Sequence, residues 1–172
     1  MFVLGIDPGL SRCGYCVLDV DRRGSSRAVA IGVLTTPVEL PVPERLAILQ
    51  RDVRELLDDY PPSSVGIERV LFQVNVSTAM SVGQASGIVM AEAASRGCTV
   101  VEYSPNQVKE AVTGNGAADK EQVQEMVRRL LGQTSVLRPA DAADAAAVAL
   151  CHVAYAPALM ADRSPTAAVG RP

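Results

Sequence analysis

Near its beginning the chain reads Phe2-Val3-Leu4-Gly5-Ile6-Asp7-Pro8-Gly9, and this segment indicates the architecture. A short apolar run without alternation is typical of a strand that is covered on both faces, at the centre of a sheet. Asp7 closes this run, and the Pro8-Gly9 pair after it predicts a turn. The sequence therefore predicts a central strand that ends in a carboxylate.

The spacing of apolar residues changes along the chain, from a strand pattern at the start to alternating helix and strand patterns from Pro43 onward. Residues 14–20 and 28–35 read as two strands joined by a loop at 21–26, which predicts an antiparallel meander. Later segments alternate between helix and strand: a helix from Pro43 to Tyr60, a strand at 65–67 ended by Glu68, a helix at 76–95, a strand at 98–103, helices at 105–113 and 119–131, and a last helix from Pro139 to about Tyr155. The pattern predicts an α/β fold with a five-stranded mixed sheet flanked by helices.

Length and composition predict one domain. The chain has 172 residues, of which 48% are hydrophobic, enough for a sizeable core. Residues 1–157 form the predicted domain, and residues 158–172 are small, polar and rich enough in proline to predict a disordered tail. The sequence shows neither a basic leader before its apolar start nor an apolar run long enough to span a membrane. We therefore expect a cytoplasmic protein. The net charge of −3 argues against coating nucleic acid through bulk charge, but it allows a local basic strip.

The cysteines are predicted to be reduced packing residues. Cys13 and Cys16 have the spacing of a redox or zinc pair, but they lie in a strand-like run, where positions i and i+3 point to opposite faces. We interpret both, with Cys98 and Cys151, as small hydrophobic side chains.

Acidic side chains stand at the ends of three predicted buried elements. Asp7 and Glu68 end strands, and Asp141 and Asp144 share one face in the first turn of the last helix. Convergence of these carboxylates would be costly without a divalent cation, and oxygen ligands favour Mg²⁺ or Mn²⁺ over zinc. Taken singly, each has a simpler explanation: a turn residue, an exposed strand end, or a partner for the helix dipole. The residues alone leave both interpretations open.

In their order and spacing, these motifs resemble the RuvC family of Holliday junction resolvases. The resemblance runs from about Phe2 to Cys151. It is carried by Gly5-Ile6-Asp7-Pro8-Gly9, Ile67-Glu68, Gln107-Val108-Lys109, Gly114-Asn115-Gly116, Asp119-Lys120 and Asp141-Ala142-Ala143-Asp144-Ala145.

The resemblance implies an enzyme with a defined site. It implies an RNase H-like fold, a homodimer, two Mg²⁺ ions per active site with Mn²⁺ as a substitute, and symmetric nicking of four-way DNA junctions during recombination and repair. By matching position, Asp7, Glu68, Asp141 and Asp144 would be the catalytic metal ligands. The RuvA–RuvB branch-migration complex is the implied protein partner.

Basic and apolar residues near these motifs are candidates for DNA contact. Lys109 and Lys120 are the two lysines of the chain, and both flank the Gly-Asn-Gly loop, which suggests phosphate contact. Arg69 could contact phosphate or pair with a carboxylate. The family commonly has an aromatic residue three positions after the catalytic glutamate, where this chain has Leu71 followed by Phe72. Either residue could act as the junction wedge, or Phe72 could pack on a partner subunit.

Other functions remain possible from the sequence. An actin-like or sugar-kinase ATPase also opens with a strand and an aspartate, but it needs a second lobe. A related nuclease acting on RNA or on another branched substrate, and a non-catalytic junction-binding module, are further alternatives. The small-residue helix around Gly83 and Gly87 could pack against a second subunit or against the sheet, and we expect His152 to pack within its helix layer.

Overall fold

A five-stranded mixed sheet forms the centre of the molecule. The computed structural model describes residues 1–21, 23–69 and 76–161. Within them the strand order is β3-β2-β1-β4-β5, with β1 antiparallel to β2 and parallel to β4. The strands are β1 (Phe2–Asp7), β2 (Arg12–Val20), β3 (Ser26–Thr35), β4 (Ser64–Glu68) and β5 (Thr99–Tyr103). The predicted fold class, the meander and the central place of the first strand are confirmed.

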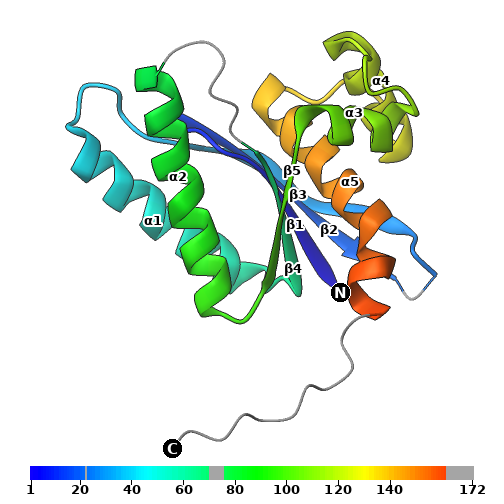
Figure 1. The fold of residues 1–172 in the computed structure, drawn as a ribbon, viewed down its shortest axis with the longest axis horizontal. Coiled ribbons are helices and arrows are strands. Elements are labelled where there is room, and N and C mark those ends of the chain that lie inside the picture. Colours follow the sequence, from blue (N-terminus) through cyan, green and yellow to red (C-terminus); the bar gives the residue numbers. More distant parts are fainter. Residues whose placement is uncertain (22, 70–75, 162–172) are drawn as a thin grey trace, which may run out of the picture.

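Helices cover both faces of this sheet. They are α1 (Val42–Asp59), α2 (Val76–Ser95), α3 (Pro105–Thr113), α4 (Lys120–Leu130) and α5 (Ala140–Ala161). Figure 1 shows α1 and α2 on one side of the sheet and α3, α4 and α5 on the other. Among the described residues, no helix combines the length and the apolar character that crossing a membrane requires.

Some predicted boundaries differ from the structure. β2 begins at Arg12 rather than residue 14, because Arg12 and Cys13 continue the ladder with β3. The last helix extends to Ala161 rather than to about Tyr155, through a segment in which alanine and leucine, strong helix formers, flank a proline. The predicted tail therefore overlaps this helix at 158–161, and its remainder, 162–172, lies outside the described residues.

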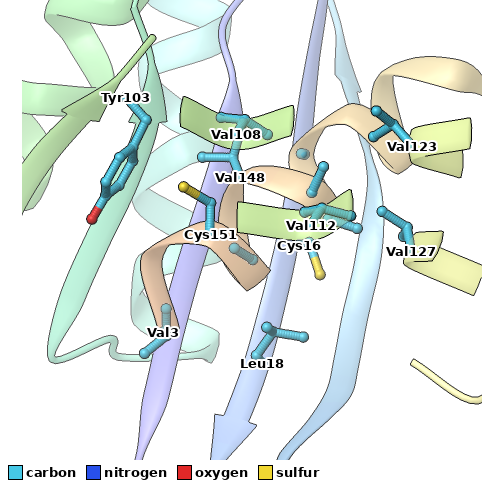
Figure 2. Packing of buried hydrophobic residues seen from close by; sticks show 14 of the residues in the cluster. Val3, Cys16, Leu18, Tyr103, Val108, Val112, Val123, Val127, Val148 and Cys151 are labelled. Atoms are coloured by element: carbon cyan, nitrogen blue, oxygen red, sulfur yellow. The ribbon is translucent and has the colours of Figure 1, made fainter. Parts of the chain in front are cut away.

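The sheet separates two hydrophobic cores. Leu4, Ile6 and Cys13 belong to the core under α1 and α2, whereas Val3 and Cys16 belong to the core under α3, α4 and α5. Figure 2 shows this second core, in which Val148 and Cys151 of α5 lie over the strands. Cys13 and Cys16 therefore point to opposite faces as predicted, and all four cysteines are free thiols.

Glycines let α5 lie directly on the strands. A Cβ added at Gly5 of β1 would overlap the backbone nitrogen of Ala149, and one added at Gly14 of β2 would overlap the carbonyl oxygen of Asp141. Ala145 and Ala149 supply the small side chains on the helix side. This close approach fixes the first turn of α5 beside the end of β1 and the start of β2, where the candidate site lies.

Candidate active site

Two carboxylates meet at one edge of the sheet because their strands run in parallel. Ile6 pairs with Ile67, so Asp7 and Glu68 follow at the carboxyl ends of neighbouring strands. The carboxyl edge of parallel strands is where α/β proteins place their ligand sites. The predicted neighbourhood of the first and fourth strands is thus confirmed.

Helix α5 brings a third carboxylate to this edge. Asp144 lines a pocket of about 370 Å³ together with Asp7 and Glu68. The other lining residues are Pro105, Val108, Lys109, Lys120, Val123 and Ala147. Asp141, three positions earlier on α5, is not part of this lining.

Both acidic residues of α5 are paired with cations. Lys120 Nζ lies 2.8 Å from Asp144 Oδ2, and Arg12 Nε lies 2.9 Å from Asp141 Oδ2. Asp7 and Glu68 make no side-chain hydrogen bond or ion pair within the described part of the chain. Among the described residues, the carboxylates at the strand ends therefore have no hydrogen-bond donor, whereas each carboxylate of α5 forms an ion pair with a basic side chain.

Burial and mutual repulsion make Asp7 reluctant to ionise. The pKa of Asp7 is raised from 3.8 to about 7, first by burial and then by the neighbouring charges of Glu68, Asp144 and Asp141, which together outweigh the lowering by Lys120. The pKa of Glu68 is also raised, first by burial and then by Asp144. Asp141 therefore lies close enough to act on Asp7 electrostatically, although it faces Arg12.

These residues fit a hard divalent cation. A carboxylate with a raised pKa and no hydrogen-bond donor is stabilised in its charged form by a nearby positive ion. The atoms at the pocket that could coordinate a metal are carboxylate oxygens, which favour Mg²⁺ or Mn²⁺ over zinc. Within residues 1–21, 23–69 and 76–161, no three histidine, cysteine or acidic side chains are already gathered at metal-binding spacing, so the ligands would close around an ion.

Local capping signals position the two lysines. Ser104 caps α3 and Asp119 caps α4, each through a capping box with a glutamine three residues later. Gly114 ends α3 in the left-handed conformation, with φ 73°, so the chain turns back toward the pocket. Lys109 and Lys120 consequently reach the same pocket from two helices.

The other predicted contacts are placed differently. Arg69 is exposed and is not part of the pocket lining; its backbone N–H donates to the carbonyl oxygen of Tyr103 at 2.7 Å. Leu71 and Phe72 lie outside the described residues. The structure therefore does not bear on their predicted roles.

Sequence reasoning missed Arg12. Its side chain joins the start of β2 to the start of α5 across 129 positions of sequence. The available signal was its place directly after the turn that follows Asp7, at the edge where strand ends gather. An isolated arginine after such a turn gives no indication of its distant partner.

His152 packs beneath the sheet and away from this chemistry. It is fully buried, its Nδ1 lies 2.8 Å from the Tyr103 hydroxyl, and burial lowers its pKa to about 4. A neutral, buried ring agrees with the predicted packing role.

Comparison with known proteins agrees with this geometry. The family model described as crossover junction endodeoxyribonuclease RuvC matches residues 3–152. The RuvC of Leifsonia xyli is 49% identical over 150 residues, covering 87% of this chain and 72% of that protein. The RuvC of Roseiflexus sp. is 49% identical over 154 residues, covering 90% and 91%.

Solved structures show the same fold. Thermus thermophilus RuvC in complex with a Holliday junction substrate superposes with a TM-score of 0.85 and 38% identity, covering 91% of this chain and 94% of that one. The yeast mitochondrial Holliday junction resolvase Ydc2 shares the fold at a TM-score of 0.63 and 15% identity, covering 94% and 82%. Because the family model matches residues 3–152 and a RuvC structure superposes over 91% of the chain, this protein belongs to the RuvC family of crossover junction endodeoxyribonucleases, with their RNase H-like fold.

Proposed function

We propose that this chain resolves Holliday junctions by divalent-metal-dependent hydrolysis of DNA phosphodiester bonds. The observation that carries the proposal is one pocket in which Asp7, Glu68 and Asp144 face Lys109 and Lys120. Acidic oxygens for a cation beside ammonium groups for phosphate are what metal-assisted phosphodiester hydrolysis requires. Family membership over residues 3–152 supports the same chemistry.

The carboxylates have the role of metal ligands. Asp7, Glu68, Asp141 and Asp144 would together hold two Mg²⁺ ions, which Mn²⁺ can replace. Divalent ions held by these carboxylates would supply the Lewis-acid chemistry that activates water and stabilises a leaving oxygen. Asp7 must be ionised to bind a cation, and its pKa of about 7 means that protons compete for this ligand near neutral pH.

The basic residues have the role of holding the DNA strand. Lys109 and Lys120 lie at the pocket as compact ammonium groups that can neutralise the phosphate being cut. Arg69, exposed beside Glu68, would contact a neighbouring phosphate. Leu71 or Phe72 would act as the wedge at the unstacked junction centre.

A homodimer matches the symmetry of the substrate. The small-residue positions Gly83 and Gly87 of α2 have open space around them: a Cβ added at either would meet nothing within 4 Å. Met80, on the same helix, is 60% exposed. This unfilled face supports packing of α2 against a second copy rather than against the sheet. The RuvA–RuvB complex, acting in the same cytoplasmic compartment, would deliver the junction.

A gel assay tests the proposal. The protein is incubated with a synthetic four-way junction, or with a linear duplex of the same sequence, with and without Mg²⁺. We expect nicked duplex products from the junction only, in Mg²⁺ only, and none with Asp7→Asn. Equal cutting of the linear duplex would favour a related single-domain nuclease, and cutting in EDTA would contradict the metal site.

A further inference from the structure

Protein cations already occupy two of the four carboxylates proposed as metal ligands. Arg12, at the start of β2, donates from Nε to Asp141 Oδ2 at 2.9 Å, and Lys120 binds Asp144 at 2.8 Å. The strand-end carboxylates Asp7 and Glu68 have no such partner among the described residues. The two acidic residues of α5 are therefore neutralised by basic side chains, whereas the two acidic residues of the sheet form no ion pair with any described residue.

A divalent ion and Arg12 compete for the same carboxylate. A cation bound by Asp141 neutralises it, as Arg12 does, but with twice the charge. The ion would repel the guanidinium even if it used the other carboxylate oxygen. The pair is also weakly held, because the Arg12 side chain is 47% exposed and that of Asp141 is 28% exposed.

The backbone that carries Arg12 is held by hydrogen bonds, whereas its half-exposed side chain has one ion-pair partner among the described residues. Thr36 holds the loop that precedes Arg12. Its N–H donates to Ser11 O at 3.3 Å, and its hydroxyl donates to Leu10 O at 2.6 Å. Arg45 adds bonds to the hydroxyls of Thr36 and Ser11. Rotation of the Arg12 side chain alone can therefore re-aim its positive charge.

The guanidinium of Arg12 has unused binding capacity. Of its N–H groups, only Nε has an acceptor within the described residues. The remaining donors form a planar fork that suits a phosphate group. Arg12 lies at the same sheet edge as Asp7, beside the pocket in which the DNA strand is proposed to lie.

We propose that Arg12 exchanges between two anions: it holds Asp141 before a divalent ion binds, and once the ion displaces it, it binds a phosphate of the DNA strand. The exchange rests on the nuclease function proposed above. Its consequence is that loading the metal releases a positive charge for DNA, so metal and substrate bind cooperatively. Arg12 is thus a substrate-positioning residue whose availability the metal controls.

The first arm of the test measures metal affinity without DNA. Mn²⁺ is titrated into the full-length protein, and the free ion is followed by electron paramagnetic resonance. Removing the competitor in Arg12→Ala should tighten Mn²⁺ binding roughly two- to fivefold, as expected for loss of an exposed ion pair. Arg51→Ala is the matched control, because Arg51 is also exposed and lies 2.8 Å from Asp52 on α1; it should leave the affinity unchanged. An unchanged or weaker affinity in Arg12→Ala overturns the exchange.

The second arm measures junction affinity against salt, in Ca²⁺ and in EDTA, with the junction checked for intactness afterwards. In Ca²⁺ the log–log slope of Arg12→Ala should be shallower than that of wild type by about 0.9, the value for one phosphate contact. In EDTA the two slopes should agree, because Arg12 is then held by Asp141. An equal difference in both conditions would make Arg12 a permanent DNA contact and overturn the proposal.

Two further measurements keep the outcomes separate. Arg12→Gln, which keeps part of the aliphatic stem and removes the charge, should reproduce both effects if Arg12→Ala melts too low to study. A wild type that neither binds nor cuts the junction would defeat the proposed function, whereas the Mn²⁺ arm would still decide whether Arg12 and the ion compete.

Discussion

At the scale of the residue, the carboxylates of the pocket differ in what neutralises them. Asp7 and Glu68 have raised pKa values and no hydrogen-bond donor among the described residues, whereas Asp144 is paired with a lysine and Asp141 with an arginine. Bound divalent ions would neutralise the negative charge of all four carboxylates together. Their individual replacement should therefore remove catalysis without removing the cations that bind DNA.

Asp7→Asn, Glu68→Gln, Asp141→Asn and Asp144→Asn should each lower junction cleavage at least about a hundredfold and leave junction binding largely intact, because each removes a metal ligand but no phosphate-binding cation. Cleavage is measured by single-turnover kinetics in Mg²⁺, and binding by gel shift in EDTA. Near wild-type rates in two or more of these variants would show that the site is wrongly assigned.

The raised pKa of Asp7 predicts a pH-dependent cost to the metal-free fold. Between its ordinary value of 3.8 and about 7, folded Asp7 holds a proton that the unfolded chain has lost, so the free energy of unfolding falls as pH rises through this window. The full change corresponds to at most about 4 kcal/mol, reduced by partial exposure to solvent. In EDTA, Asp7→Asn should melt close to wild type near pH 4.5 and above it at pH 8.

The comparison with Asp7→Asn is needed because His152, with its lowered pKa, has the opposite effect and makes stability rise with pH from about 4 toward 6.5. His152 is common to both proteins and cancels in the difference. Millimolar Mn²⁺ at pH 8 should raise the melting temperature of wild type more than that of the variant. A difference in melting temperature that does not change with pH would contradict the crowding of charge around Asp7.

The lysines predict a distinct effect on DNA affinity. Lys109→Ala and Lys120→Ala should each weaken junction binding and reduce the slope of log affinity against log salt by about 0.9. The reason is that binding releases fewer counterions when one phosphate contact is missing. Lys120→Ala should also free Asp144, its partner at 2.8 Å. The measurement is a gel-shift titration in Ca²⁺ at several salt concentrations. Slopes equal to wild type in both variants would identify the lysines as solvated surface residues.

At the scale of the element, the site depends on how closely α5 lies on the sheet. Gly5→Ala would place a methyl group against the backbone of Ala149, which only a shift of the helix can relieve. Overpacking of this kind typically costs about 1–3 kcal/mol, and here it would also move Asp141 and Asp144 away from the strand ends. We expect a lower melting temperature and lower activity together.

Gly116→Ala is the matched control for this substitution. A Cβ at Gly116 meets its nearest atoms at 3.4 Å, an ordinary contact distance, so the melting temperature should change little. Thermal unfolding by circular dichroism in EDTA compares the two variants. Equal melting temperatures for Gly5→Ala and wild type would contradict the close packing of α5.

Part of the site could be predicted from the sequence, because it depends on single elements. An apolar run that ends in an acid made Asp7 and Glu68 candidates, and parallel pairing of the two strands places them together. Spacing on a helix made Asp141 and Asp144 candidates, but the shared role of all four as metal ligands was implied by the resemblance to the RuvC family. Arg12 could not be predicted, because its ion pair depends on the docking of α5 over Gly14, which periodicity does not encode.

At the scale of the whole molecule, one chain supplies one candidate active site, whereas a four-way junction presents two strands to be cut. A twofold dimer provides two identical sites related by the symmetry of the junction. The open face of α2 around Gly83 and Gly87 is the surface that the proposed dimer would use. Symmetry is therefore the property that separates a resolvase from a nuclease that cuts branched DNA one strand at a time.

Mapping of the nicks on a four-way junction with two identical sites, strand by strand, tests this account most directly. Wild-type protein should nick two strands of like polarity at positions related by the twofold axis of the junction. A mixture with Asp7→Asn should form heterodimers that nick one strand and leave the other intact. Nicks at unrelated positions, or a protein that sediments as a monomer on the junction, would contradict the assignment as a junction resolvase.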